Sequence, residues 1–218
     1  MHAVLLDFNG TMIFDSSLHL EAWSKIYQEL HPESTEPPSP QQVCGPRNEA
    51  ILQKIAPWLS AEECEQYSVR KEEMYRQACV SQPGKVQLVA GLEDFLNTLQ
   101  RKGIPFGLAS ASIKDNIDFF YETYALGRWF KKEDIVYDDG TYADKGAMHL
   151  EAARRLGVAF SDCLVIEDSP SSIRHAKENG AGCIVAITGD AADPSEVVRP
   201  GADHHIRDFS AFDYAWLA

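Results

Sequence analysis

Residues 1–11 read MHAVLLDFNGT, and this stretch decides the fold class of the chain. Four apolar residues lead into the carboxylate of Asp7, and a Gly-Thr turn follows. A short apolar strand that ends at a polar side chain and a turn is typical of a parallel α/β sheet, whose ligand sites border the carboxyl ends of the strands. Asp7 is therefore a candidate nucleophile, because a carboxylate can accept a transferred group covalently.

Asn9 stands two residues after Asp7, where its side chain can serve the same substrate. A carboxamide neither releases nor accepts a proton near neutral pH, so Asn9 cannot act as a general acid or base. Asn9 is thus the position that decides how active such a site can be.

The composition indicates a globular protein that handles small molecules. The 218 residues are 44% hydrophobic, which suffices for a full core, and the formal net charge is −13. Nucleic acids favour clustered Lys and Arg, so this acidic chain is not expected to bind them. Five scattered cysteines without a CxxC spacing indicate neither a disulfide framework nor a zinc site.

No apolar stretch approaches the roughly 18 residues of a membrane span. The first residues also lack the basic and apolar regions of a signal peptide. We therefore expect a cytoplasmic protein without a membrane partner.

Short apolar runs alternate with helix-length segments, which predicts an α/β fold with a Rossmann-like, doubly wound parallel sheet. The expected strands are 4–8, 106–109, 135–137, 164–166, 184–187 and 204–206. The expected helices between them are 91–102, 114–124, 146–156 and 170–179.

The segment between the first two strands is too long for one crossover, and its patterns are helical. One apolar helical face runs over residues 17–30, and residues 48–55 fit another helix. Capping-box patterns begin at Ser39 and Ser60, and the second opens a long polar helix. We therefore predict an all-helical cap domain at residues 15–83, inserted into a sheet core of residues 1–14 and 84–218.

Polar side chains follow three of the expected strands at the point where each ends. Asp7 follows the first strand, Ser110 follows the second, and Glu167-Asp168 follows the fourth. Each alone would suit the start of a helix, but the carboxyl ends of these strands meet at one crevice. Together they predict a site for Mg²⁺ and phosphate, because Mg²⁺ prefers oxygen ligands.

In order and spacing, Asp7-Phe-Asn-Gly-Thr11, Ser110, Lys145 and Glu167-Asp168 resemble the four motifs of the haloacid dehalogenase superfamily. The helical insert after the first motif resembles the cap of its β-phosphoglucomutase-like subgroup. The resemblance covers essentially the whole chain. It implies a Mg²⁺-dependent hydrolase that acts on a small phosphorylated metabolite.

Carried over to this chain, the resemblance makes Asp7 the residue that becomes an aspartyl phosphate. It implies that Mg²⁺ is held by Asp7, the backbone carbonyl of Asn9, Glu167 and Asp168, and that Ser110 and Lys145 hold phosphoryl oxygens. Phosphoryl transfer depends mostly on positioning and charge neutralisation, which such a set can supply. The family usually has proline after this lysine, whereas Gly146 stands here.

The resemblance also implies substrate-binding residues, which are Thr11, His19, Arg47, Ser112 and Asn116. His19 and Trp23 lie one helical turn apart, and packing of the first cap helix remains an alternative role for them. Arg47 follows Gly45-Pro46 at a helix start, where a guanidinium can hold a distal phosphate or carboxylate.

In family phosphatases and mutases the position of Asn9 is typically aspartate, which protonates the leaving oxygen. An amide removes a contribution of roughly 10²–10⁴ in rate.

Four functions therefore stay open. A hydrolase tolerates Asn9 or moves the proton through His19. A sugar-phosphate mutase suffers more from the amide, and a phosphate-binding module needs no turnover. For carbon-phosphorus or carbon-halogen cleavage, the Glu167-Asp168 pair argues against metal-free dehalogenases, and Lys54 matches no Schiff-base lysine.

Overall fold

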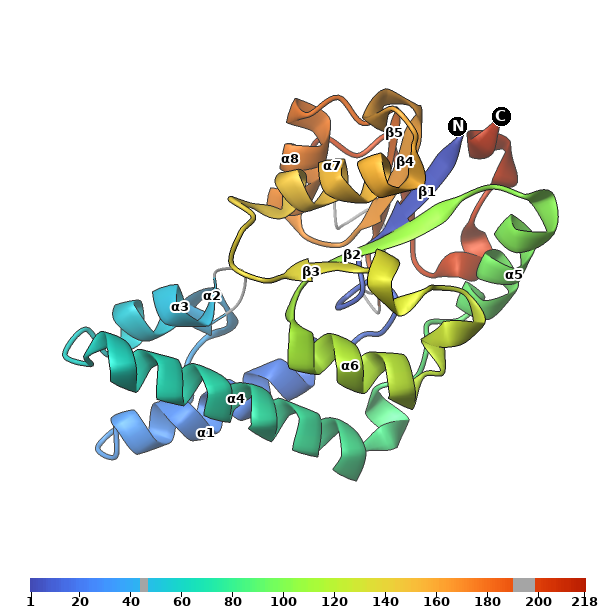
Figure 1. Ribbon diagram of the computed structural model, residues 1–218. Coiled ribbons are helices and arrows are strands. Elements are labelled where there is room, and N and C mark those ends of the chain that lie inside the picture. The colour runs from blue at the N-terminus through green and yellow to red at the C-terminus, as the bar shows by residue number, and fades with distance from the viewer. Residues whose placement is uncertain (44–46, 190–198) are drawn as a thin grey trace. The chain divides into compact units, whose positions relative to one another are not determined.

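The computed structural model describes residues 1–43, 47–189 and 199–218, and the chain divides into two compact units (Figure 1). The sheet unit consists of Met1–Phe14 and Gln87–Ala218, and the helical unit consists of Asp15–Val86. The helical unit is therefore inserted after the first strand of the sheet unit.

The sheet unit contains a six-stranded parallel sheet in the order β3-β2-β1-β4-β5-β6. The strands are β1 (Ala3–Leu6), β2 (Phe106–Ile113), β3 (Val136–Asp138), β4 (Cys163–Glu167), β5 (Cys183–Ile187) and β6 (His204–Ile206). The chain first moves outward from β1 to β3 and then returns to the other side of β1. The reversal places a switch point between β1 and β4, where α/β sheets bind ligands.

All six expected strands are present, but β2 extends further than its apolar run predicts. Ser110 and Ile113 still pair with Tyr137 and Asp138 of β3, with a register shift between them. Serine and alanine hide this extension in the sequence, because they carry no apolar or alternating signal.

Within the described part of the sheet unit, four α-helices flank the strands. They are α5 (Leu92–Lys102), α6 (Lys114–Thr123), α7 (Lys145–Leu156) and α8 (Pro170–Glu178). Figure 1 shows α7 and α8 on one face of the sheet and α6 on the other. Helix α7 begins at Lys145, one residue before the predicted start, because the side chain of Asp144 accepts a hydrogen bond from the Ala147 amide at 2.9 Å.

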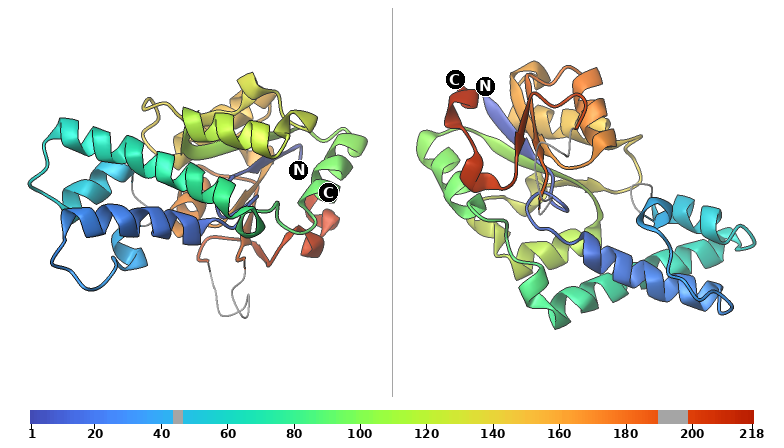
Figure 2. Two further views of the ribbon diagram at one scale, coloured as in Figure 1. Left: turned by 90° about the horizontal axis from the view of Figure 1, so that it is seen from below. Right: turned by 180° about the vertical axis from the view of Figure 1, so that it is seen from behind.

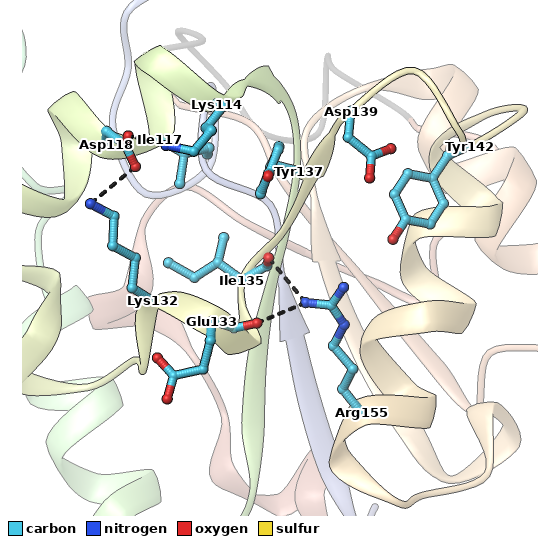
Figure 3. A pocket seen from close by; sticks show the side chains of 10 residues that line it. All are labelled: Lys114, Ile117, Asp118, Lys132, Glu133, Ile135, Tyr137, Asp139, Tyr142 and Arg155. Carbon is cyan, nitrogen blue, oxygen red and sulfur yellow. Dashed lines mark hydrogen bonds and ion pairs between the residues drawn. The ribbon is translucent and has the colours of Figure 1, made fainter.

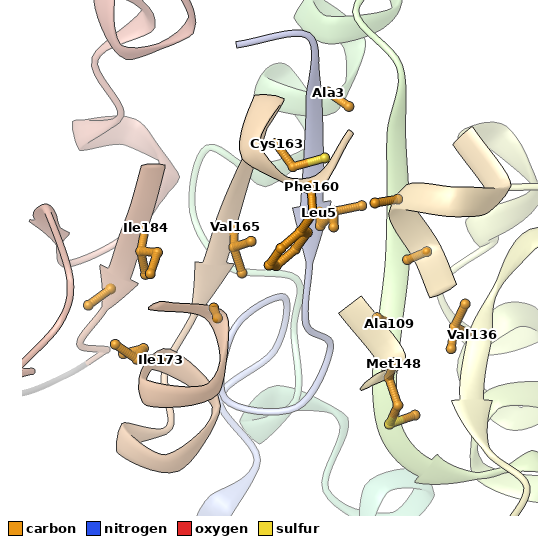
Figure 4. Close-up of a cluster of buried hydrophobic side chains, with 14 residues drawn as sticks. Ala3, Leu5, Ala109, Val136, Met148, Phe160, Cys163, Val165, Ile173 and Ile184 are labelled. Carbon is orange, nitrogen blue, oxygen red and sulfur yellow. The ribbon is translucent and has the colours of Figure 1, made fainter. Parts of the chain in front are cut away.

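The core of the sheet unit fills the space between the sheet and helices α7 and α8 (Figure 4). Leu5 and Val165 from the central strands meet Met148 of α7 and Ile173 of α8, and all four are buried. Strands buried on both faces are nearly continuous apolar runs, which explains the opening sequence.

The two chain ends lie side by side at the edge of the sheet unit (Figure 2). The amino terminus of Met1 donates a hydrogen bond to the carbonyl oxygen of Leu217 at 2.8 Å. The first strand is therefore held in place by the last residues of the chain.

The helical unit consists of α1 (Ser16–Leu30), α2 (Pro40–Val43), α3 (Asn48–Ile55) and α4 (Ala61–Ser81). The predicted capping box at Ser60 is present, since Ser60 and Glu63 exchange hydrogen bonds of 3.2 and 2.8 Å. Trp23 is buried in the apolar core of this unit, as the packing alternative requires. Among the described residues, no helix has the length and hydropathy that crossing a membrane requires.

Candidate active site

The site is built where β1 and β4 end. Asp7 follows β1, Glu167 ends β4, and Asp168 comes next. Because β1 and β4 are parallel neighbours, these side chains meet at one edge of the sheet. One oxygen from each of the three carboxylates lies within 4.8 Å of the others, so the group could hold a metal ion.

Gly10 lets the loop after β1 approach Asp168. Its φ is +76°, a left-handed conformation that strains other residues. A Cβ atom at this position would overlap the Oδ2 atom of Asp168. The glycine of the first motif is thus required by both the turn and the neighbouring carboxylate.

Lys145 is the cation of the site. Its ammonium group is buried, donates a hydrogen bond to Oδ1 of Asp7 and lies 3.4 Å from Oε1 of Glu167. The start of α7 therefore delivers the positive charge to the carboxylates at the strand ends.

Gly146, which departs from the family pattern, is explained by the approach of α8. A Cβ atom on residue 146 would overlap the side-chain nitrogen of Asn179 and would lie 3.0 Å from the Cβ atom of His175. A side chain at this position would require the Asn179 amide to turn away and the His175 side chain to shift slightly.

Burial, and then repulsion between neighbouring carboxylates, disfavours the ionised forms of Asp7 and Asp168. Burial raises the pKa of Asp7 to about 7, although Lys145 opposes the rise. Burial, together with the charges of Glu167 and Asp7, also raises the pKa of Asp168 well above its usual range. Burial alone would raise the pKa of Glu167, but Lys145 and His149 outweigh it and lower that pKa.

This donor set fits a divalent cation. If all three carboxylates are ionised, their charge exceeds that of Lys145, and a divalent cation would balance the excess. Oε1 of Glu167 is also buried without a hydrogen-bond partner among the described residues. All the donors are hard oxygens, which suit Mg²⁺.

Asn9 is held by the end of β2. The hydroxyl of Ser112 donates a hydrogen bond to Oδ1 of Asn9 at 2.7 Å, and the hydroxyl of Ser110 lies 3.5 Å from the same atom. The structure thus brings Asn9, Ser110 and Ser112 together, and Ser112 donates its backbone N–H to Ser110 Oγ at 3.2 Å.

Two expected substrate-binding residues of the sheet unit are enclosed. Thr11 has no exposed surface, and its hydroxyl has no hydrogen-bond partner among the described residues. Asn116 is 2% exposed and lies in the first turn of α6. Their substrate contacts stay predictions.

In the helical unit, His19 belongs to a buried chain of polar groups. Its Nδ1 atom faces the ammonium of Lys71 at 2.7 Å, and its Nε2 atom lies 3.2 Å from Oδ2 of Asp15. Its ring stacks on Tyr75, whose hydroxyl donates to the same oxygen of Asp15. Lys71 also donates to Glu72 at 2.8 Å. Both nitrogens of His19 are therefore engaged within this unit.

Arg47 is exposed and directly precedes α3. The preceding Gly45-Pro46 segment, which is part of the same prediction, lies outside the described residues. A role for Arg47 in holding a distal group stays a prediction.

Sequence reasoning missed two residues that contact the carboxylate cluster. His149 lies one turn after Lys145 on α7, with its Nε2 atom 3.4 Å from Oε1 of Glu167. Because His149 stands four residues after Lys145, helical spacing alone could have predicted that both lie on one side of α7. Arg199 donates from Nε to the backbone oxygen of Asp168 at 3.0 Å. No sequence motif predicted this contact.

A cavity of about 480 Å³ lies beside β3 and contains none of these residues (Figure 3). Lys114 and Lys132 approach Asp118 there at 2.5 and 3.0 Å. Arg155 donates to the backbone oxygens of Glu133 and Ile135. Since its cations already have partners, this cavity does not offer the charge that a phosphate needs.

Comparison with known proteins identifies the family of this chain. The model of the haloacid dehalogenase-like hydrolase family matches residues 1–180. The protein CbbY of Cupriavidus necator is 24% identical, over 99% of this chain and 96% of that protein.

Solved structures share the fold over nearly the full length. A family IA haloacid dehalogenase hydrolase from Entamoeba histolytica is 29% identical and has a TM-score of 0.88, covering 100% of this chain and 97% of its own. An aspartate-to-asparagine mutant of CbbY from Rhodobacter sphaeroides, in complex with xylulose 1,5-bisphosphate, is 18% identical with a TM-score of 0.78. That match covers 97% of this chain and 96% of the other.

Proposed function

The chain belongs to the haloacid dehalogenase-like hydrolase family, and from that premise we propose that it is a Mg²⁺-dependent phosphohydrolase of a small phosphorylated metabolite. The observation that carries the proposal is the contact of Asp7 with Lys145 beside Glu167 and Asp168. In this proposal Asp7 is the nucleophile and Lys145 is the cation. Glu167 and Asp168 are further metal ligands.

In the proposed first step, a carboxylate oxygen of Asp7 attacks the phosphorus of the ester. A new P–O bond to Asp7 forms while the bond to the leaving oxygen breaks, and the leaving group departs with that electron pair. Lys145 and Ser110 hold the phosphoryl oxygens throughout. When bound by Asp7, the Asn9 carbonyl, Glu167 and Asp168, Mg²⁺ supplies charge neutralisation for the transferred group.

In the proposed second step, water attacks the phosphorus of the aspartyl phosphate. The bond to Asp7 breaks, phosphate leaves, and the proton of the water passes to solvent. Lys145 opposes protonation of the released Asp7 carboxylate and so favours the form that attacks in the next turnover.

Asn9 sets the leaving-group preference in this proposal. Its carboxamide can donate or accept a hydrogen bond, but it cannot protonate the leaving oxygen. Phenolates and carboxylates leave without a proton, so aryl and acyl phosphates should react faster than alkyl sugar phosphates.

We do not assign proton transfer to His19. Lys71 donates to one of its ring nitrogens and Asp15 approaches the other, so a substrate would have to displace a buried partner. In this account the leaving group takes its proton from solvent.

A second candidate function is phosphate-ester binding with little turnover. The hydrogen bond from Ser112 to Asn9 favours it, because it holds an amide where the family places its acid and base. The CbbY mutant with asparagine in place of an aspartate was solved with a sugar bisphosphate bound. By analogy, this chain would bind a sugar phosphate and leave it intact. A mutase is less well supported, since it needs proton exchange at two hydroxyls.

The test is a hydrolysis panel of an aryl phosphate, acetyl phosphate and several sugar phosphates with Mg²⁺. We expect turnover of the first two, slower turnover of sugar phosphates, and no turnover by Asp7→Asn. If wild type and Asp7→Asn are equally inert while sugar phosphates still bind, the binding function replaces the hydrolase. Interconversion of glucose 1- and 6-phosphate would favour the mutase.

A further inference from the structure

His149 is a buried histidine behind the candidate metal ligands. It has no exposed surface and lies on the same side of α7 as Lys145, one turn further along. Neither of its ring nitrogens has a hydrogen bond of standard geometry to the described residues. Oε1 of Glu167 lies 3.4 Å from Nε2, is equally buried, and also lacks a hydrogen bond of standard geometry to the described residues. A buried donor and a buried acceptor, neither with such a hydrogen bond, thus face each other.

The two oxygens of Glu167 are approached from different elements. Oε2 accepts the backbone N–H groups of Asp168 and Ser169 at 3.2 and 3.4 Å. Among the described residues, Oε1 is approached by two side chains of α7, Lys145 and His149, each at 3.4 Å. Lys145 also bonds to Asp7, so its ammonium is shared between two carboxylates.

We propose that His149 is a positioning residue, which donates its Nε2–H to Oε1 of Glu167 and thereby fixes this carboxylate for metal binding. Histidine and carboxylate partners commonly orient the ligands of metal sites from behind. The distance of 3.4 Å is slightly longer than a normal N–H···O hydrogen bond, so a small shift of Glu167 completes the contact.

A role in packing alone does not explain the choice of histidine. Apart from Lys145, which pairs with Asp7, the other buried positions of α7 are nonpolar. They include Met148, Ala152 and Ala153, which belong to the apolar core of the sheet unit. An imidazole buried among such residues is costly unless a polar partner receives its N–H. Glu167 is the partner within reach.

The inference rests on the proposed metal site, and it is tested without turnover. We would measure Mn²⁺ affinity by electron paramagnetic resonance for wild type, His149→Leu and His149→Gln. We expect the leucine variant to bind Mn²⁺ at least about tenfold more weakly. The glutamine variant, which keeps an N–H donor, should recover most of the affinity.

Met148→Ala is the matched control, because it opens the same helix face without touching Glu167 in the described contacts. It should lower thermal stability and leave Mn²⁺ affinity unchanged. Wild-type affinity in His149→Leu, or an equal loss in Met148→Ala, would overturn the proposal.

If His149→Leu does not fold, nitrogen NMR of the wild-type ring decides the question. We expect the proton on Nε2, with an Nε2 shift that changes when Mg²⁺ binds. A proton on Nδ1 alone would overturn the proposal. A wild type that binds Mn²⁺ but hydrolyses no phosphate ester would contradict the proposed function and leave this inference standing.

Discussion

The side-chain oxygen of Asn9 accepts a hydrogen bond from the hydroxyl of Ser112 at 2.7 Å. This contact places the end of β2 directly against the residue that departs from the family pattern. It also means that any side chain introduced at position 9 meets a hydroxyl donor.

We predict that Asn9→Asp raises hydrolysis of alkyl sugar phosphates at least tenfold. A positioned acid-base group contributes roughly 10²–10⁴ in rate, so the gain can be larger. The gain for aryl phosphates should be smaller, because their leaving groups need no proton. Steady-state kcat/KM for both ester classes checks this. Equal gains for both ester classes would show that the new carboxyl group does not act by protonating the leaving oxygen.

The Ser112 hydroxyl should lower the pKa of the carboxyl introduced by Asn9→Asp, because it bonds to the ionised form. Removing the donor with Ser112→Ala should therefore raise that pKa. We expect the double variant to keep its activity on sugar phosphates to higher pH than Asn9→Asp alone. If the pH profiles of kcat for the single and the double variant superimpose, the Ser112 hydroxyl does not change the pKa of the new carboxyl group.

Gly10→Ala should disrupt the site more than the fold. The new Cβ atom would displace the Asp168 carboxylate, and we expect at least about a tenfold loss of metal affinity. Gly103→Ala is the control, since Gly103 also has a positive φ of +65° but has nothing within 4 Å of an added Cβ atom. Each substitution should cost roughly 1–2 kcal/mol of backbone strain. Only Gly10→Ala should weaken Mn²⁺ binding.

Tyr75→Phe should destabilise the chain through the helical unit. It removes the donor from Asp15, a carboxylate that is 1% exposed, and leaving a buried acceptor with less hydrogen bonding costs about 1–3 kcal/mol. Tyr67→Phe, in the same helix but only half-buried, should change the free energy of unfolding by less than about 0.5 kcal/mol. Urea denaturation followed by circular dichroism compares the two, and equal effects would argue against the Asp15 contact.

Metal-free protein should lose stability as the pH rises. The folded state raises the pKa of Asp7 from 3.8 to about 7, so it holds a proton that the unfolded state releases. This stabilisation is complete below about pH 4 and is lost as the pH rises through about 7. Asp168 acts in the same direction, whereas the lowered pKa of Glu167 affects stability only at more acidic pH.

Mg²⁺ competes with these protons, so the increase in Tm that it causes should grow from pH 5 to pH 8. Thermal scans with Mg²⁺ and with EDTA measure it, and Asp7→Asn should flatten the pH dependence of the EDTA series. A metal-free Tm that rises over this range would contradict the assignment.

Much of the sheet unit could be predicted because its signals are local. Apolar runs of strand length, with Asp7 or Glu167 at their ends, mark β1 and β4 without reference to distant residues. Ser110 and Ser112, near the end of β2, carried no such signal, so the extension of this strand appeared only through its pairing with β3.

The polar interior of the helical unit could not be predicted. Lys71 and Glu72 stand in a run of charged residues in α4, where any charge looks solvated, yet they are 2% and 6% exposed. Their burial depends on Asp15 and His19, about fifty residues earlier in the chain. His149 and Gly146 are similar cases. His149 faces Glu167 of β4, and Gly146 lies against His175 of α8, which are distant in the sequence.

The central claim is that Asp7 accepts the phosphoryl group, and the direct measurement is rapid-quench mass spectrometry during turnover of acetyl phosphate with Mg²⁺. We predict that the peptide containing Asp7 gains the mass of one phosphoryl group, that hydroxylamine removes it, and that Asp7→Asn shows neither. Turnover without a modified Asp7 peptide, or with Asp7→Asn fully active, would contradict the account.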